Sequence, residues 1–184
     1  MRLQPWTEAD LAVELRNDAA DMTTFLGGPQ GEEVVRRRHE RFLRGQADGT
    51  ISPFTVWAEA ADAAEEPVGA AAYWQIDHHG RAVYECGWFV FVPFQRRGYA
   101  RHAIRLLLDH AAARGERDTM LAFPRVDNAA SNALARSAGF VNTGVEDSEY
   151  PKGVPITVNA WAFDLRTLRT PRTPRTPQTP RTPR

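Results

Sequence analysis

The chain has 184 residues, of which 42% are hydrophobic and 25% are charged, and it carries 23 basic and 23 acidic side chains. These values are ordinary for one soluble domain with a full core, and no run approaches the roughly 18 apolar residues of a membrane-spanning helix. The single cysteine, Cys86, excludes an intrachain disulfide and a cysteine-based metal site.

The first third of the chain predicts a short strand and two helices. The start, MRLQPWTEADL, lacks the long apolar stretch and cleavage site of a secretory signal, so we expect a cytoplasmic protein. After a short apolar start at Leu3, Thr7 and Asp10 have the spacing of a helix N-cap and an acid three residues later, which predicts a helix to about residue 20. Apolar residues at helical spacing predict a second helix over residues 30–46.

The remainder of the body alternates strand patterns with two further helices. The β-branched and aromatic runs predict strands over residues 54–60, 68–76, 83–92, 119–123, 141–146 and 156–165. The amphipathic patterns predict helices over residues 99–114 and from about Asn128 to Gly139. The resulting order, β-α-α-β-β-β-α-β-α-β-β, predicts an α/β fold with a mixed sheet flanked by helices.

Residues 166–184 differ from the body in composition. They hold six arginines and no acids in a Thr-Pro-Arg repeat, which leaves 17 basic against 23 acidic residues for the body. A proline at every third position favours an extended chain, so we expect a domain over residues 1–165 and a disordered tail over 166–184. Such a tail can bind nucleic acid or an acidic partner, although we favour a solvated appendage without a specific partner.

The segment FVFVPFQRRGYARHA, residues 89–103, predicts an anion-binding turn. Pro93 ends a strand, and the chain then enters a helix whose first amides, about four in number, have no helical acceptor and carry partial positive charge. Gly98 has no Cβ, so phosphate oxygens can approach the backbone closely, and Ala100 keeps the next helical position small. The alternative is that the arginines are only solvated and that Gly98 loosens a turn.

The letters QRRGYA match the Gln/Arg-x-x-Gly-x-Gly/Ala signature of the GCN5-related N-acetyltransferase superfamily. The segments ECGWFVFVPFQRRGYARHAIRLLLDHA and DNAASNALARSAGF resemble its acetyl-CoA core, particularly in the branch that acetylates the N-termini of ribosomal proteins. The similarity is close over residues 84–140, whereas Arg101-His102 departs from the Thr-Glu that is frequent in that branch. The resemblance implies a mostly antiparallel sheet of about six to seven strands with about four helices, splayed at the cofactor site.

The resemblance also implies an activity, which is direct transfer of an acetyl group from acetyl-CoA to a primary amine. The acceptor would be a protein N-terminus or a small molecule, and the acidic body favours a cationic one. The alternative is a non-catalytic acyl-CoA-binding module whose basic tail makes it an adaptor to nucleic acid or to another protein.

The resemblance assigns cofactor-binding residues to three segments. The backbone of the splayed strand would bind the pantetheine arm, the turn amides would bind the pyrophosphate, and an Asn-x-x-Ser pair would lie near the arm and the thioester sulfur. These residues are Val90 and Val92, then Gln95, Arg96, Arg97, Gly98, Tyr99 and Ala100, then Asn128 and Ser131. The alternatives are that Asn128 is a plain helix cap and that Ser131 is a surface residue.

Acetyl transfer needs a base for the amine and a proton for the leaving thiolate. Glu85 is the predicted base, because strand alternation places it on one face with Val83 and Phe89, where apolar surroundings would raise its pKa. The alternative is that Glu85 pairs with Arg81. Ser131, or else Tyr150, would protonate the thiolate.

Other reactive residue types have weaker patterns. We expect no metal at Asp77-His78-His79, because consecutive residues at a strand end point to opposite sides. Cys86 has no basic neighbour in the sequence and is expected in the core. An acceptor pocket could be lined by residues that are equally suited to the core, namely Trp6, Phe25, Leu26, Tyr73 and Trp74.

Overall fold

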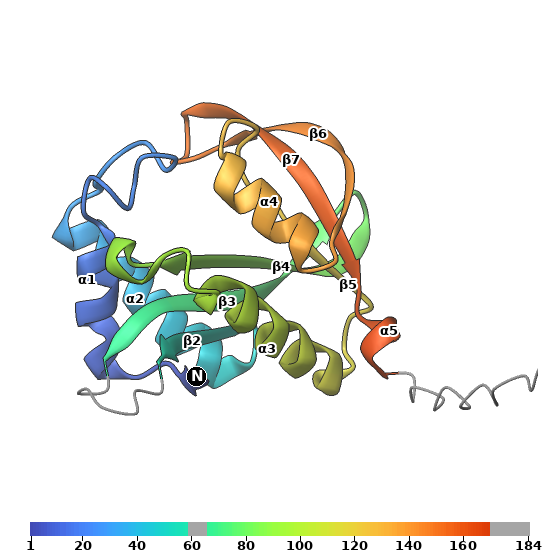
Figure 1. Ribbon diagram of the computed structural model, residues 1–184, viewed down its shortest axis with the longest axis horizontal. Coiled ribbons are helices and arrows are strands. Elements are labelled where there is room, and N and C mark those ends of the chain that lie inside the picture. Colours follow the sequence, from blue (N-terminus) through green and yellow to red (C-terminus); the bar gives the residue numbers. More distant parts are fainter. Residues whose placement is uncertain (59–65, 170–184) are drawn as a thin grey trace, which may run out of the picture.

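The computed structural model describes residues 1–58 and 66–169. These residues form one seven-stranded sheet in the order β1-β2-β3-β4-β5-β7-β6 (Figure 1). The strands are β1 (Arg2–Pro5), β2 (Ile51–Trp57), β3 (Pro67–His78), β4 (Arg81–Val90), β5 (Thr119–Ala122), β6 (Val141–Glu149) and β7 (Pro155–Asp164). The helices are α1 (Leu11–Asn17), α2 (Glu32–Asp48), α3 (Tyr99–Arg114), α4 (Ala129–Ser137) and α5 (Arg166–Arg169), with 3-10 turns η1 (Glu8–Asp10) and η2 (Val92–Phe94).

The order of strands and helices expected from the sequence is confirmed, and the sheet is antiparallel at every pairing except β4 with β5. The predicted helix over residues 99–114 has the bounds of α3. The predicted strand over 83–92 is too long at its end, because Val92–Phe94 forms η2 and the strand stops at Val90.

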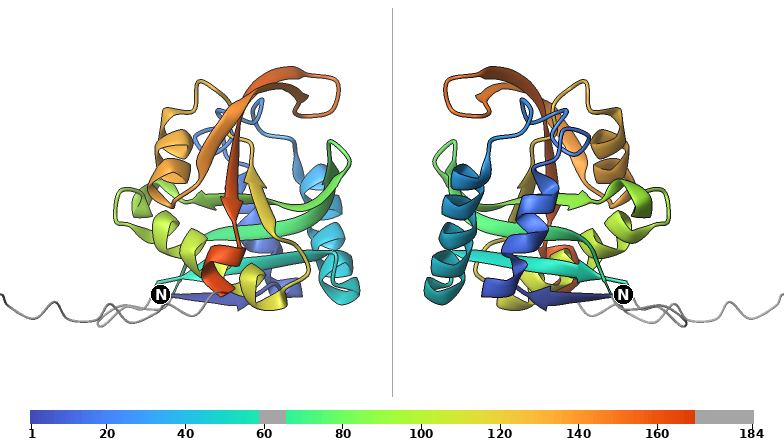
Figure 2. Two further views of the ribbon diagram at one scale, coloured as in Figure 1. Left: turned by 90° about the vertical axis from the view of Figure 1, so that its right-hand side faces the viewer. Right: turned by 90° about the vertical axis from the view of Figure 1, so that its left-hand side faces the viewer.

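The helices cover the sheet on both faces, with α1 and α2 on one side and α3 and α4 on the other (Figure 2). The face toward α3 holds the larger core, in which Ile104, Leu107 and Tyr84 are at most 1% exposed. The face toward α1 and α2 holds a smaller core that includes Trp6 and Phe91. Because side chains alternate along β4, its residues contribute to both cores in turn.

The helix α5 extends the folded body beyond the predicted boundary at residue 165. Arg169 Nε donates to the carbonyl oxygen of Ala112 at 2.9 Å, and its Nη1 lies 2.6 Å from Asp118 Oδ1. Arg166–Arg169 therefore packs on the body and is not part of a tail. Residues 170–184, on which the rest of the tail prediction falls, lie outside the described residues.

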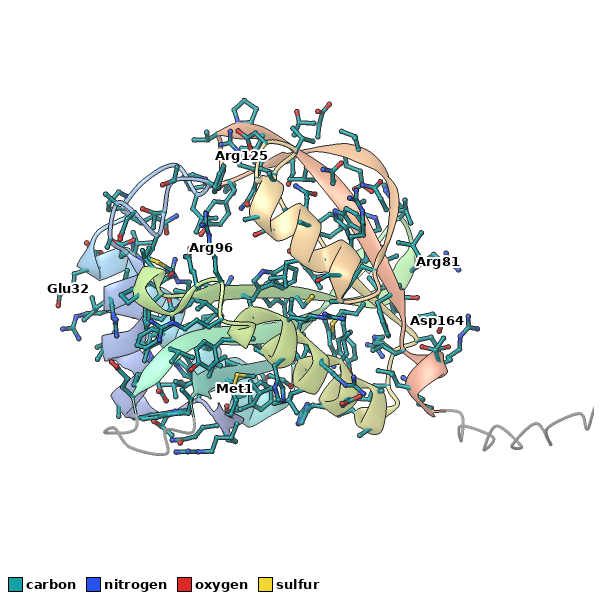
Figure 3. All side chains as sticks on the ribbon, in the orientation of Figure 1. Met1, Glu32, Arg81, Arg96, Arg125 and Asp164 are labelled. Atoms are coloured by element: carbon teal, nitrogen blue, oxygen red, sulfur yellow. The ribbon has the colours of Figure 1, made fainter. Side chains whose placement is uncertain are left out.

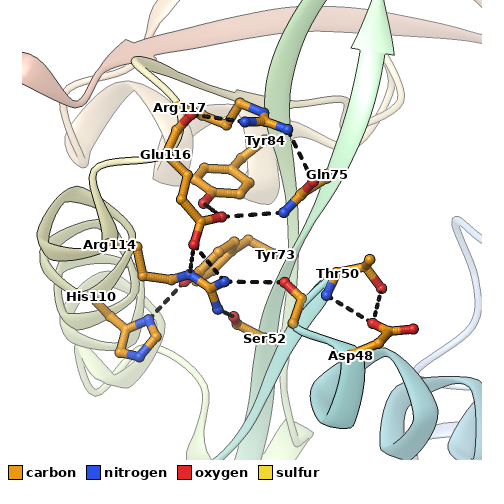
Figure 4. Close-up of polar contacts among 11 residues, drawn as sticks. Asp48, Thr50, Ser52, Tyr73, Gln75, Tyr84, His110, Arg114, Glu116 and Arg117 are labelled. Carbon is orange, nitrogen blue, oxygen red and sulfur yellow. Dashed lines mark hydrogen bonds and ion pairs between the residues drawn. The ribbon is translucent and has the colours of Figure 1, made fainter.

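A polar network ties the end of α3 to the middle of the sheet (Figure 4). Glu116 Oε2 accepts from the Tyr84 hydroxyl at 3.1 Å, and Glu116 Oε1 accepts from Arg114 at 2.7 Å. Arg114 also donates to Ser52 Oγ at 3.3 Å, and the Tyr73 hydroxyl lies 2.8 Å from His110 Nδ1. These contacts satisfy polar groups that the packing of α3 would otherwise bury without partners.

Within the described chain, no helix combines the length and apolar composition needed to cross a membrane.

The strands β3 and β4 approach each other very closely at Gly69. A Cβ at this position would lie 2.1 Å from the carbonyl oxygen of Phe89 and 2.9 Å from Val90 Cα. Both contacts are with backbone atoms, which cannot move aside as the end of a side chain can.

We therefore predict that Gly69→Ala lowers the free energy of unfolding by about 2 kcal/mol or more, because the added methyl group forces the strands apart. Urea unfolding followed by circular dichroism measures this loss. Gly87→Ala is the matched control on the partner strand, since its Cβ would meet only the Trp74 ring at 3.4 Å. Equal stability of the two variants would contradict the close approach.

The Tyr84 network predicts a loss of stability at high pH. Burial and the bond to Glu116 raise the pKa of Tyr84 to about 12, whereas an unfolded tyrosine titrates near 10. The unfolded chain therefore releases this proton first, so the free energy of unfolding falls as the pH rises from about 10 to 12. In Tyr84→Phe the fall over this range should be smaller, and an unchanged slope in urea unfolding would refute the assignment.

Candidate functional site

The strands β4 and β5 run parallel but part almost at once. Strand β4 pairs with β3 from Arg81 to Val90, whereas it pairs with β5 only through Tyr84 with Met120 and Glu85 with Leu121. From Cys86 onward, the side of β4 that faces away from β3 has no strand partner in the described chain. The sheet is therefore open along this edge, as the fold resemblance implied.

Val90 presents its backbone to the open edge. The amide of Phe91 donates to the carbonyl oxygen of Val68 in β3 at 2.9 Å, so its neighbour Val90 directs its own amide and carbonyl to the opposite side. The Val90 carbonyl accepts from Gln95 Nε2 at 2.9 Å. The Val90 amide is thus the backbone donor that remains at the end of the open edge.

The structure corrects two of the predicted cofactor contacts, those of Val92 and of the Gln95 amide. Val92 belongs to η2, and its carbonyl accepts from the Gln95 amide at 3.2 Å, so Val92 lies in the turn and not on the strand. The same bond occupies the Gln95 amide, which corrects the prediction that this amide is free for an anion. Both groups of Gln95 stabilise the turn internally.

The turn after Gln95 is shaped by two left-handed residues. Arg96 has φ of 61° and Gly98 has φ of 83°, and Gly98 precedes α3 without a side-chain cap. Such left-handed positions orient successive amides toward one side, which forms a concave site for an anion. Among the described residues, the amides of Arg96, Arg97, Gly98, Tyr99 and Ala100 have no hydrogen-bond acceptor. The turn therefore offers five unpaired donors at the positively charged end of α3.

The side chains of the turn add unpaired positive charge. Arg96 and Arg97 are exposed, and neither forms an ion pair with any carboxylate that the structure describes. In Figure 3 the Arg96 side chain projects from the turn toward the region between α4 and the loop that joins α1 to α2. Both guanidinium groups are thus available to an anionic ligand.

Glu85 lies at the point where β4 and β5 part. Burial raises the pKa of its carboxyl group, while a hydrogen bond from Trp74 Nε1 to Oε2 at 3.2 Å and the charge of Arg41 act in the opposite direction. Oε1 accepts no hydrogen bond from the described chain. The proposed pairing with Arg81 is not formed within the described residues, so the partner of Glu85 is an indole and not a cation.

Asn128 and Ser131 lie at the start of α4. Asn128 is the N-cap, and its Oδ1 accepts from the amide of Ser131 at 3.0 Å. This is the capping role that the sequence left open beside a ligand role. The Ser131 hydroxyl has no hydrogen-bond partner among the described residues, so it is available to a ligand.

Asn132 has a positioning role that the sequence did not indicate. Its Nδ2 donates to the carbonyls of Arg125 and Asn128 at 2.8 Å, and its Oδ1 accepts from Asn159 and Trp161 at 2.8 Å. The contacts with Asn159 and Trp161 join the start of α4 to β7, and those with the two carbonyls fix the loop before α4, so together they hold Asn128 and Ser131 in place. Because Asn159 and Trp161 come from a distant segment, only their approach in the fold reveals this role.

Burial separates core residues from possible pocket residues among Cys86 and the aromatic residues suggested for an acceptor pocket. Cys86 is 4% exposed in the α3-side core, where burial raises the pKa of its thiol, so the prediction of core packing is confirmed. Trp6 and Tyr73 are also core residues and cannot line an open pocket. Trp74 is half-buried beside Glu85, and Phe25 is half-buried in the α1–α2 loop.

Two loops meet on the side of α1 and α2. A Cβ at Gly27 in the α1–α2 loop would lie 3.1 Å from Pro151 in the β6–β7 turn. Figure 1 shows these two loops approaching each other at the upper left. Segments from both halves of the sheet therefore come together at this side of the opening.

Solved structures with a similar fold include several acetyltransferases. The structure of the Salmonella typhimurium acetyltransferase that modifies the N-terminal serine of ribosomal protein L7/L12 matches with a TM-score of 0.69 and 21% identity, over 88% of this chain and 93% of that chain. The Vibrio cholerae spermidine N-acetyltransferase with CoA and spermine matches with a TM-score of 0.72 and 18% identity, over 92% and 98%. The Brucella melitensis ribosomal-protein-alanine N-acetyltransferase gives 0.68 and 22%, over 89% and 99%.

At these identities the structural likeness establishes the fold. A comparison with curated protein sequences gives no match. The model of the acetyltransferase (GNAT) domain family matches residues 1–141, which contain β4, the amide turn and α4. On this match, and in agreement with the open β4 edge, the chain belongs to the acetyltransferase (GNAT) domain family.

Proposed function

We propose that this protein is an N-acetyltransferase that moves the acetyl group of acetyl-CoA to a primary amine. The observation that carries the proposal is the continuity of two features, since the unpaired edge of β4 runs through η2 directly into the amide turn of residues 96–100. An extended arm ending in a diphosphate requires such a pair of sites. Family membership supports the same proposal, as does the complex of the similar Vibrio cholerae structure with CoA and spermine.

Acetyl-CoA would bind along this path. The pantetheine arm would lie in the opening and pair with the Val90 amide as a strand would, and the pyrophosphate would accept from the amides of Arg96 to Ala100. The arginine side chains would neutralise part of the phosphate charge. Asn128 Nδ2 and Ser131 at the start of α4 would contact the arm from the other half of the sheet.

The reaction would proceed by direct attack. The amine nitrogen forms a bond to the thioester carbonyl carbon, the carbon–sulfur bond breaks, and the amine loses one proton. Glu85 would accept that proton through its free Oε1 and later release it to solvent. The Ser131 hydroxyl would give a proton to the leaving thiolate and regain one from solvent, so both groups return to their starting state. A carboxylate with a raised pKa is better matched to a proton transfer near neutral pH than an ordinary glutamate.

The acceptor is proposed to be a protein N-terminus or a small cationic amine. The body carries an excess of acidic over basic residues, which attracts positively charged substrates. The similar structures include enzymes named for both acceptor classes.

The direct test is release of free thiol from acetyl-CoA with a panel of peptides and small amines. We expect turnover with at least one acceptor, both for the full chain and for a chain ending at Arg169, which keeps α5. If the full chain binds CoA but acetylates nothing, the adaptor alternative replaces the enzyme. If removing residues 170–184 changes neither binding partners nor rate, the adaptor alternative is refuted.

Gly98→Val is predicted to weaken CoA binding at least about tenfold, about 1.4 kcal/mol, because a branched side chain resists the left-handed turn and blocks the approach of phosphate. Isothermal titration with CoA measures the change. Gly115→Val is the matched control, since Gly115 ends the same helix with φ of 70° and equally open surroundings. Equal CoA affinities of the two variants would show that the amide turn does not bind CoA.

Glu85→Gln is predicted to lower kcat while leaving CoA affinity nearly unchanged, because the base is lost and the cofactor contacts remain. The wild-type kcat/KM should rise with pH as the carboxyl group loses its proton, and the variant should lack this rise. Steady-state kinetics across pH decide the matter. A normal pH profile in Glu85→Gln would exclude Glu85 as the base.

Trp74→Phe is predicted to move the rise of kcat/KM along the pH scale, whereas Glu85→Gln is predicted to abolish it. The Trp74 indole donates to Glu85 and so stabilises the charged carboxylate, which lowers its pKa. Removing this donor should raise the pKa further, so the rise in kcat/KM should move to higher pH. An unmoved profile would show that the bond does not govern the titrating group.

A further inference from the structure

The tip of the β3–β4 hairpin brings two histidines to a glutamate of β6. His78 Nε2 lies 3.3 Å from Glu146 Oε1, His79 Nε2 lies 3.8 Å from the same oxygen, and the three ligand atoms are all within 4.8 Å of one another. We propose that His78, His79 and Glu146 form a binding site for a divalent transition metal, best matched by Zn²⁺, separate from the acetyl-transfer site.

The two histidines converge because of the backbone of the hairpin turn. His78 pairs with Arg81, so the loop has only two residues, His79 and Gly80, and both have positive φ, 52° and 72°. This is the two-residue turn in which the chain reverses within the loop. Asp77 Oδ1 accepts from the Gly80 amide at 2.9 Å and stabilises it.

The turn overturns the expectation that these side chains diverge. Alternation applies along an extended strand, but His79 is left-handed, and its ring centroid lies only 4.1 Å from that of His78. The sequence argument against a metal at His78-His79 was therefore wrong in its geometry.

The third ligand comes from the far half of the sheet. Glu146 belongs to the edge strand β6, whereas the histidines belong to the hairpin on the other side of the β4–β5 parting. The ring of Phe123, just after β5, lies 5.3 Å from the His78 ring and supports it. Figure 1 shows the light-green hairpin tip beside β6.

The donor set and its spacing suit zinc. Two imidazole nitrogens and one carboxylate oxygen, with a water in the fourth position, form a known zinc-ligand combination. Bonds of about 2.0–2.1 Å in a tetrahedron separate neighbouring ligand atoms by about 3.4 Å, close to the two contacts with Glu146. The His79 side chain is 75% exposed, so an ion and a water can enter from solvent.

An ion pair without a metal explains the cluster less well. Both rings face the same oxygen of Glu146, yet neither contact is among the hydrogen bonds of the described chain. A metal ion instead uses one lone pair from each of the three groups. It would join the hairpin to β6 in the folded state only, so its binding should stabilise the fold.

The test uses the full chain and Zn²⁺ alone. We expect one equivalent to bind in isothermal titration calorimetry, an increase in Tm with zinc in excess, and the visible absorption of a tetrahedral ion when Co²⁺ is substituted. Glu146→Gln and His79→Asn should each weaken zinc binding at least about tenfold. Asparagine is well tolerated at a left-handed turn position, so His79→Asn should retain the fold and its Tm without metal.

Two control variants locate the site. Asp147→Asn changes the adjacent carboxylate of β6, and His102→Ala removes an exposed histidine of α3; neither should alter zinc affinity. The absence of zinc binding to the wild-type chain would overturn the proposal. Binding that persists in Glu146→Gln and His79→Asn, or is lost equally in the controls, would overturn it as well.

Discussion

The short pairing between β4 and β5 is the constraint on which the site depends. A strand edge left without a partner exposes backbone groups that must find another acceptor or donor. Here two residue pairs hold the strands together at Glu85, and the edge beyond them is open until Val90. The rest of the fold supports this opening, because the β3 ladder continues to Val90 on one side and Asn132 holds α4 to β7 on the other.

Two hydrogen bonds made by Gln95 connect the open edge of β4 to the amide turn. Gln95 uses its amide and its side chain to bind the carbonyls of Val92 and Val90, which leaves the following five amides unpaired. The left-handed backbone at Arg96, a residue with a side chain, costs about 1–3 kcal/mol in general, and such strain is concentrated at functional sites. A turn that served only to connect β4 with α3 would not require it.

Local patterns predicted the elements well and the contacts between segments poorly. The helix over 99–114, the glycine before it and the cap at Asn128 depend on neighbouring residues, so their sequence signals were sufficient. The roles of Trp74 and Asn132 depend on partners brought together by folding. The role of Gln95 depends on the 3-10 turn Val92–Phe94, which the predicted strand over residues 83–92 missed. The convergence of His78 and His79 depends on a left-handed histidine, which the alternation rule for strands does not anticipate. The contact of α5 through Arg169 was not predicted, because residues 166–169 were grouped with the arginine-rich repeat that follows them.

The central claim is that amides of residues 96–100, and not that of Gln95, hold the diphosphate of CoA. An amide NMR spectrum of the isotope-labelled protein, recorded with and without CoA, tests it most directly. We predict large shifts for the amides of Arg96 to Ala100 and a small one for Gln95, whose bond to Val92 is retained. Binding of CoA that leaves the resonances of Arg96 to Ala100 in place would contradict the account.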